Sequence, residues 1–127
     1  MNIKNKVLVV EDDEAMRNAI VETFKNNNYV VESAVNGQEG MDKIDSFKPD
    51  LLLLDLNLPV MSGLSVISKV RDDYGVWGRD LKVIILTNLG ASDDMLDQVA
   101  KYEPAFYLIK SEVELSDVIA KAKECLA

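Results

Sequence analysis

The chain has 127 residues, of which 48% are hydrophobic, and we expect one globular domain over residues 1–127 with a full core. The formal net charge of −8 at pH 7 argues against nucleic acids and anionic membranes as partners, because both attract basic surfaces. The absence of histidine excludes a Ser/His/Asp triad and histidine-ligated zinc within the chain.

The sequence also favours a cytoplasmic protein. The single cysteine, Cys125, cannot form an internal disulfide, so a reducing compartment is the simplest interpretation. No apolar stretch approaches the ~20 residues needed to span a bilayer. Residues 1–6 lack the apolar region of a signal peptide.

Strands and helices alternate from the start of the chain. Residues 6–10 form a β-branched apolar run that predicts a strand. Apolar side chains recur at helical spacing over residues 16–24, and Asp12 or Asp13 can cap that helix. Residues 29–34 form a more polar run, which predicts a strand near a sheet edge.

The middle of the chain contains its most apolar run. A helix over residues 36–47 leads to four consecutive leucines at residues 51–54. Such a run between breakers predicts a strand buried on both faces. Pro59 and Gly63 end it and start a loop, so Asp55 is expected where the buried strand meets solvent.

The alternation continues to the end of the chain. We expect a helix over residues 63–74, a connection at residues 75–80 and a strand at residues 82–86. Ser92 can cap a short helix around residues 95–99.

A fifth strand is expected at residues 105–109, and residues 111–114 fit a capping box for the last helix, at residues 115–126. Five alternations predict an α/β fold, in which helices cover both faces of a parallel sheet. We expect a flavodoxin-like, doubly wound (βα)5 domain with strand order 2-1-3-4-5.

Four of the five apolar runs end in reactive polar groups. These groups are Glu11 with Asp12, then Asp55, Thr87 and Lys110. Because all strands of a parallel sheet end at the same edge, the polar groups should converge there. With the first and third strands as neighbours, the acids of the first should face Asp55.

Three clustered carboxylates repel one another unless a cation lies among them. An all-oxygen site suits Mg²⁺, or Mn²⁺ in its place. With the cation, Lys110 and Thr87 would form a cradle for a phosphoryl group on Asp55, since a carboxylate can accept phosphoryl covalently.

Four segments together resemble a known family. They are residues 9–13 (VVEDD), residues 52–59 (LLLDLNLP) with Gly63, residues 84–87 (IILT) and residues 107–110 (YLIK). In this order and at these strand ends, the chain resembles the receiver (CheY-like) domain of bacterial two-component response regulators over essentially its whole length.

The resemblance implies that Asp55 accepts phosphoryl from the phosphohistidine of a histidine kinase or phosphotransfer protein. It implies that Asp12, Asp55 and the main-chain carbonyl of Asn57 bind Mg²⁺, with Glu11 acting mostly through water. It also implies that Lys110 pairs with the acyl phosphate. The domain would phosphorylate and dephosphorylate itself as a signalling unit, and would not be a turnover enzyme acting on an external substrate.

The resemblance further implies a switch. Thr87 would hydrogen-bond the phosphoryl group and move inward, and Tyr107 would swing from exposed to buried. The face formed by residues 95–99, 105–109 and 115–126 would change. We expect a monomer or a weak phosphorylation-dependent dimer, acting on an unknown protein target or on an output domain missing from this chain.

Three positions depart from the family pattern. Ser111 stands where the family often has proline, which puts a cis peptide bond after Lys110 in doubt. Asn88 is larger than the small residue favoured after the threonine, and Leu89 is apolar and near the entrance to the site. These changes bear on how long the phosphoryl group stays and on partner choice.

Other interpretations stay open. A small aspartyl-phosphate hydrolase would share the aspartate, lysine, threonine and Mg²⁺, but it normally has a second acid where this chain has Asn57. A flavodoxin-like cofactor binder would need a Ser/Thr/Gly-rich phosphate loop, where this chain has four acids at residues 11–14. A pseudo-receiver that is never phosphorylated would keep the same residues and act as a protein-binding module.

Overall fold

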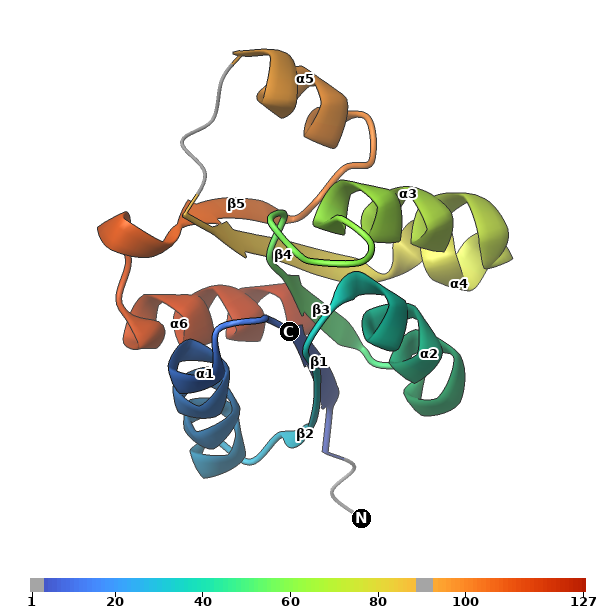
Figure 1. Cartoon of the computed structure of the whole chain (residues 1–127). Helices are drawn as coiled ribbons and strands as arrows, with labels where there is room; N and C mark the ends of the chain where they lie inside the picture. Colours follow the sequence, from blue (N-terminus) through green and yellow to red (C-terminus); the bar gives the residue numbers. More distant parts are fainter. Residues whose placement is uncertain (1–3, 89–92) are drawn as a thin grey trace.

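A computed structural model describes residues 4–88 and 93–127 and shows a parallel sheet with helices on both faces (Figure 1). The strands are β1 (Lys6–Val10), β2 (Val30–Ala34), β3 (Leu51–Leu54), β4 (Lys82–Thr87) and β5 (Phe106–Ile109). The helices are α1 (Glu14–Asn26), α2 (Gly37–Phe47), α3 (Gly63–Asp73), α4 (Gly75–Asp80), α5 (Asp93–Ala100), the 3-10 turn η1 (Lys110–Glu112) and α6 (Leu115–Leu126).

The sheet has the order β2-β1-β3-β4-β5, with every neighbouring pair parallel, as predicted. Val10 at the end of β1 is level with Leu54 at the end of β3. Thr87 at the end of β4 is level with Ile109 of β5. The residues that follow these strands therefore emerge at one edge of the sheet.

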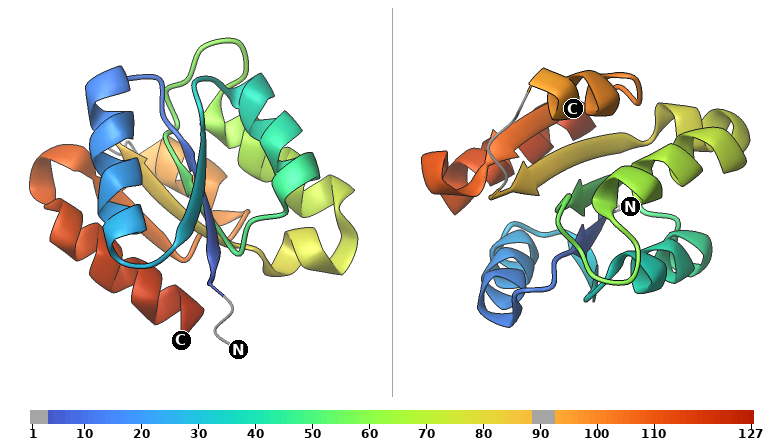
Figure 2. Two further views of the ribbon diagram at one scale, coloured as in Figure 1. Left: turned by 90° about the horizontal axis from the view of Figure 1, so that it is seen from below. Right: turned by 45° about the horizontal axis from the view of Figure 1, so that its top comes forward.

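The side chains of each strand alternate between two apolar layers. Leu52 and Leu54 belong to the layer that includes α2 and α3, and Leu51 and Leu53 to the layer that includes α1 and α6. The left view of Figure 2 shows α1 beside α6 and α2 beside α3. All four leucines are almost fully buried, so β3 is fixed from both faces as the sequence predicts.

Three helices begin at side-chain caps, of which only Asp13 was predicted as a cap. The side chain of Asp13 accepts the N–H of Met16 at the start of α1. Asn36 caps α2 in the same way, and Ser62 caps α3. These caps fix where each helix leaves the edge of the sheet that carries the strand ends.

Residues 75–80, expected as a connection, form the short helix α4. Arg71 of α3 stabilises it by donating from Nη1 to the carbonyl oxygens of Gly78 and Leu81 at 2.8 and 2.7 Å. The ammonium of Lys48 also lies 4.9 Å from the centroid of the Trp77 ring. Tertiary contacts therefore create a helix that the local sequence does not indicate.

The expected capping box at residues 111–114 is wrong. The chain leaves β5 through η1, which takes in Ser111, and the N-cap of α6 is Glu114. The carboxylate of Asp117 accepts the N–H of Glu114 at 2.8 Å. A tight turn uses the residues that resembled a cap, and the capping box lies three residues later, at Glu114 and Asp117.

The described residues contain no cis peptide bond, and the bond between Lys110 and Ser111 is therefore trans. Leu89 and Ser92 lie outside the described residues. Within the described parts of the chain, no helix is long and apolar enough to cross a bilayer.

Candidate functional site

Three carboxylates gather at the carboxyl end of the sheet. Glu11, Asp12 and Asp55 each offer one oxygen, and these oxygens all lie within 4.8 Å of one another. Glu11 is 2% exposed and Asp55 is 5% exposed, whereas Asp12 faces solvent. The group therefore has two buried members and one side open to water.

The sheet itself holds these acids in place. The N–H of Asp55 donates to the carbonyl of Val10 at 3.2 Å, and the N–H of Glu11 donates to the carbonyl of Ala34 at 3.1 Å. These bonds extend the ladder one residue beyond the strands. Each buried carboxylate thus stands on backbone that the sheet fixes.

Lys110 joins the cluster from the end of β5. Its Nζ atom lies 2.9 Å from Oδ2 of Asp55 and also forms an ion pair with Oε1 of Glu11. Its side chain is as buried as the two carboxylates. One ammonium faces three acids, so the site is negative overall and favours a further cation.

Burial and pairing act in opposite directions on these groups. Burial raises the pKa of the Glu11 carboxyl, and the nearby Asp55 charge adds to this, while hydrogen bonds from Lys110 and from the Asp13 N–H oppose it. Burial alone would lower the pKa of Lys110, but the bonds to Glu11 and Asp55 outweigh burial and raise it. The ammonium therefore stays charged between its two carboxylates.

Asp55 is also fixed from the loop that follows it. The N–H of Asn57 donates to Oδ1 of Asp55 at 3.1 Å. At the start of α3, a Cβ added to Gly63 would lie 2.1 Å from the carbonyl oxygen of Asp55. The backbone of α3 therefore packs directly behind Asp55, at a distance that only glycine permits.

Thr87 and Tyr107 lie on the strands β4 and β5, of which only Thr87 is a strand end. Thr87 is fully buried at the end of β4, and Tyr107 on β5 is half-buried. Burial raises the pKa of the Tyr107 hydroxyl, and the charge of Asp55 raises it further. Tyr107 is thus close enough to respond to charge on Asp55, while its switching role and that of Thr87 stay predictions.

One contributor was not anticipated from the sequence. Arg17 of α1 donates from Nη1 to the carbonyl oxygens of Glu11 and Asp12 at 3.0 and 3.3 Å. The guanidinium holds the backbone between the two acids without neutralising their carboxylates. The sequence does place Arg17 one helical turn after the acidic residues, and this spacing could have indicated the contact.

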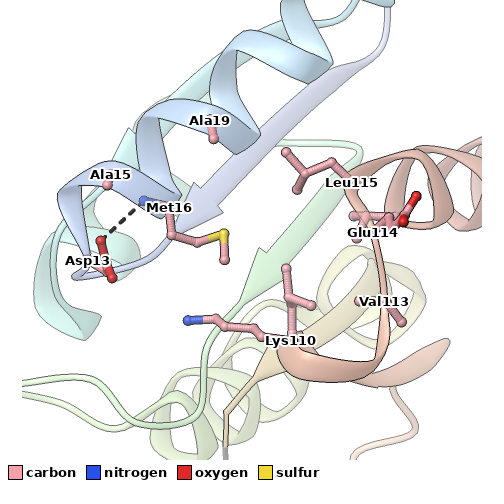
Figure 3. A pocket seen from close by; sticks show the side chains of 10 residues that line it. Asp13, Ala15, Met16, Ala19, Lys110, Val113, Glu114 and Leu115 are labelled. Carbon is pink, nitrogen blue, oxygen red and sulfur yellow. Dashed lines mark hydrogen bonds between the residues drawn. The ribbon is translucent and has the colours of Figure 1, made fainter.

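A hollow of about 520 Å³ adjoins the site between α1 and the residues that precede α6. Figure 3 shows Asp13, Met16 and Lys110 around this hollow, with Val113 and Leu115 across from α1. Most of its lining is apolar. The charged cluster is therefore bordered on this side by a mostly apolar surface.

Comparison with known proteins identifies the family of this chain. A family model described as a response regulator receiver domain matches residues 7–123. Response regulator MprA of Mycobacterium avium (strain 104) is 38% identical over 95 residues, which cover 75% of this chain and 39% of that protein. The protein of the same name from Mycobacterium tuberculosis (strain ATCC 25618 / H37Rv) is also 38% identical over 95 residues, which cover 75% of this chain and 38% of that protein. The chain thus spans about two fifths of the length of these relatives.

Solved structures agree with the fold. A CheY-like response regulator receiver domain protein from Methanospirillum hungatei JF-1 has a TM-score of 0.87 at 27% identity, covering 96% of this chain and 93% of that one. The chemotaxis response regulator CheY4 of Vibrio cholerae has a TM-score of 0.86 at 23% identity, covering 97% and 99%. The family match over residues 7–123 includes all five strands except Lys6, together with all four polar strand ends, and the chain belongs to the response regulator receiver domain family.

Proposed function

We propose that this chain accepts a phosphoryl group on Asp55 from the phosphohistidine of a histidine kinase or phosphotransfer protein. The observation that carries the proposal is the pairing of buried Asp55 with Lys110 beside two further carboxylates. A buried nucleophile, an adjacent ammonium and a group of metal-binding oxygens are the parts that phosphoryl transfer to a carboxylate needs.

The carboxylates fit a divalent cation. Glu11, Asp12 and Asp55 offer hard oxygen donors close together, and the exposed side of Asp12 leaves room for the waters that Mg²⁺ retains. The main-chain carbonyl of Asn57 would complete the protein ligands. Bound Mg²⁺, or Mn²⁺, would neutralise charge on the oxygens of the transferring phosphoryl group.

In the proposed transfer, a carboxylate oxygen of Asp55 attacks phosphorus while the bond from phosphorus to the donor imidazole breaks. The imidazole leaves with the electron pair and takes up a proton. Lys110, already 2.9 Å from Asp55, would then pair with a phosphoryl oxygen. The hydroxyl of Thr87 would donate a hydrogen bond to another.

The acyl phosphate would change the surface at the β5 edge of the sheet. Phosphorylation adds roughly −1.5 to −2 charge at neutral pH. Thr87 would move toward that charge, and Tyr107 would pack behind it. The face formed by α5, β5 and α6 would then differ between the two states, so a downstream protein could distinguish them.

We propose that residues 1–127 act as one receiver domain. The longer relatives favour an output segment or a separate protein target as the next component. The domain would serve as a signalling unit that gains and loses its own phosphoryl group. The hydrolase alternative is less favoured, because the exposed residue two positions after Asp55 is Asn57 and cannot serve as a second acid.

The test is transfer from a small donor. The chain is incubated with acetyl phosphate and Mg²⁺, and its intact mass is measured. We expect one phosphoryl adduct that requires Mg²⁺ and is lost in Asp55→Asn. A folded sample that binds Mg²⁺ and forms no adduct would favour the unphosphorylated protein-binding alternative.

A further inference from the structure

Asp12 is the member of the acidic group that its surroundings hold least directly. It is exposed, whereas Glu11 and Asp55 are buried and paired with Lys110. Asp12 also lies on the bend between β1 and α1, outside both elements. The direction of its side chain therefore depends on how the backbone is fixed at this bend.

Arg17 holds the backbone on both sides of Asp12. Its Nη1 atom donates to the carbonyl oxygen of Glu11 at 3.0 Å and to that of Asp12 at 3.3 Å. The first carbonyl belongs to the peptide unit before the Cα atom of Asp12, and the second belongs to the unit after it. Because each peptide unit is planar, holding both units sets the direction in which the Asp12 side chain leaves the backbone.

The second of these peptide units is held at both of its ends. Its carbonyl accepts from Arg17, and its N–H, which belongs to Asp13, donates to Oε2 of Glu11 at 3.2 Å. The other carboxylate oxygen of Glu11 pairs with Lys110. This peptide unit thus connects Arg17 to the buried ion pair, and it places the Asp12 carboxylate relative to that of Glu11.

Arg17 is itself fixed by the helix that it belongs to. Its N–H donates to the carbonyl of Asp13 at 2.8 Å, and Asp13 caps α1 with its carboxylate. The side chain is half-buried, and its planar guanidinium presents N–H donors in fixed directions. Within residues 4–88 and 93–127, no main-chain N–H donates to the carbonyl of Glu11 or Asp12. These two oxygens therefore depend on the arginine.

The charge of Arg17 is directed at the carbonyls and not at the carboxylates. The described residues form ion pairs through Lys43 and Lys110 and not through Arg17. By its charge alone, the guanidinium would oppose the binding of a second cation nearby. By its hydrogen bonds, it would favour that cation. Position and charge therefore predict opposite effects on cation affinity when Arg17 is removed.

We propose that Arg17 is a positioning residue for the divalent cation, which keeps the Asp12 carboxylate beside those of Glu11 and Asp55 by fixing the main chain. This inference rests on the proposed function and deepens its cation site. Removing a side chain that orients a metal ligand lowers metal affinity by roughly 10- to 100-fold. Arg17 acts through the backbone of the ligand, so the lower end of this range applies.

The test compares wild type with Arg17→Met, Arg17→Lys and Lys25→Met. Methionine keeps an apolar stem but removes the charge and the donors, whereas lysine keeps the charge and an N–H donor group. Lys25→Met is the matched control, because Lys25 is exposed in the last turn of α1, about two turns beyond Arg17. It removes the same charge from the same helix without a contact to the bend.

Three readouts separate positioning from stability. Electron paramagnetic resonance of free Mn²⁺ gives the Mn²⁺ affinity, and competition with Mn²⁺ gives that of Mg²⁺. Urea unfolding without metal gives the stability of the same samples. Labelling by acetyl phosphate over a Mg²⁺ series gives the half-maximal Mg²⁺ concentration and, separately, the maximal rate.

We expect Arg17→Met to weaken the binding of both cations by about ten-fold and to raise the half-maximal Mg²⁺ concentration by a similar factor. The maximal labelling rate should change less than about two-fold, because Asp55 and Lys110 are untouched. Arg17→Lys should recover part of the affinity. Lys25→Met should bind both cations within about two-fold of wild type, because salt screens a distant exposed charge.

The positioning role and the proposed function fail in different ways. Cation affinity in Arg17→Met equal to or higher than that of wild type would overturn the positioning role, whatever the change in stability. A ten-fold loss of affinity in a protein that acetyl phosphate does not label would support the positioning role and contradict phosphorylation of Asp55. Absence of cation binding by wild type would contradict the cation site on which both depend.

Discussion

The Nζ atom of Lys110 lies 2.9 Å from Oδ2 of Asp55, although the two residues are 55 positions apart in the chain. The same ammonium also pairs with Glu11, at the end of a third strand. Topology alone brings these groups together, because β1, β3 and β5 all end at one edge of the sheet. The ion pairs are therefore a property of the fold and of no local motif.

Replacing Lys110 tests how strongly the fold depends on these pairs. Lys110→Met would leave Glu11 and Asp55 buried without a counter-charge, and we expect a loss of about 3 kcal/mol in unfolding free energy. Lys43→Met is the matched control, because Lys43 pairs with Glu32 at 3.0 Å on the surface. Its loss should be under about 1 kcal/mol. Urea unfolding without Mg²⁺ measures both, and equal losses would contradict a buried network.

Metal binding should involve Asp12 but not its neighbour. Millimolar Mg²⁺ should raise the melting temperature by relieving repulsion among the acids, and Asp12→Asn should reduce that rise. Asp13→Asn is the control, since Asp13 caps α1 and asparagine caps a helix as well. The three proteins are compared by thermal melts over a Mg²⁺ series. Equal shifts in both variants would mean that Asp12 is not part of the cation site.

Gly63 should tolerate no side chain. In Gly63→Ala the added Cβ would have to move the backbone of Asp55, and overpacking of this kind costs roughly 1–3 kcal/mol. Gly40→Ala is the comparison, because its Cβ would meet a methyl group of Val10 at 3.1 Å, a smaller overlap. Urea unfolding should rank Gly63→Ala as the more destabilised variant. The reverse order would show that the β3–α3 loop adapts easily.

Alkaline pH should weaken the contact between Tyr74 and Asp45. The Tyr74 hydroxyl donates to Oδ1 of Asp45 at 2.6 Å. Burial first, and then this bond, raise the pKa of Tyr74 to about 12 from its ordinary value of 10.0. Because the neutral hydroxyl is favoured in the folded state, its contribution is complete below pH 10 and is lost as pH rises through about 12.

The matched variant is Tyr74→Phe, which lacks the hydroxyl. At pH 7 we expect it to lose about 1 kcal/mol of unfolding free energy, as for one partly exposed hydrogen bond to a carboxylate. Above pH 10 the difference between the two proteins should shrink. Urea unfolding at pH values from 7 to 11.5 measures it. A constant difference across this range would contradict the raised pKa.

Much of the candidate site could be predicted from the sequence. A parallel sheet makes strand ends converge, so Glu11, Asp12, Asp55 and Lys110 could be placed together once the strands were recognised. What could not be predicted is the sharing of Lys110 between two carboxylates. This sharing depends on the conformation of the long Lys110 side chain. The alternation of strands and helices carries no information about that conformation.

The missed elements have one physical cause in common. The helix α4 contains Gly75 and Gly78 and depends on Arg71 of the preceding helix and on Lys48, which is distant in the sequence. The shifted cap at Glu114 likewise depends on a contact within the folded chain, because its N–H donates to the carboxylate of Asp117. Local patterns identify elements, whereas tertiary contacts decide short helices, turns and caps.

The most direct measurement is the location of the phosphoryl group. The chain is phosphorylated with acetyl phosphate and Mg²⁺, the acyl phosphate is reduced with borohydride, and the peptides are sequenced by tandem mass spectrometry. The account predicts that the modified residue is Asp55, and that Glu11, Asp12 and Asp13 are unmodified. Modification of another carboxylate with Asp55 intact would contradict it.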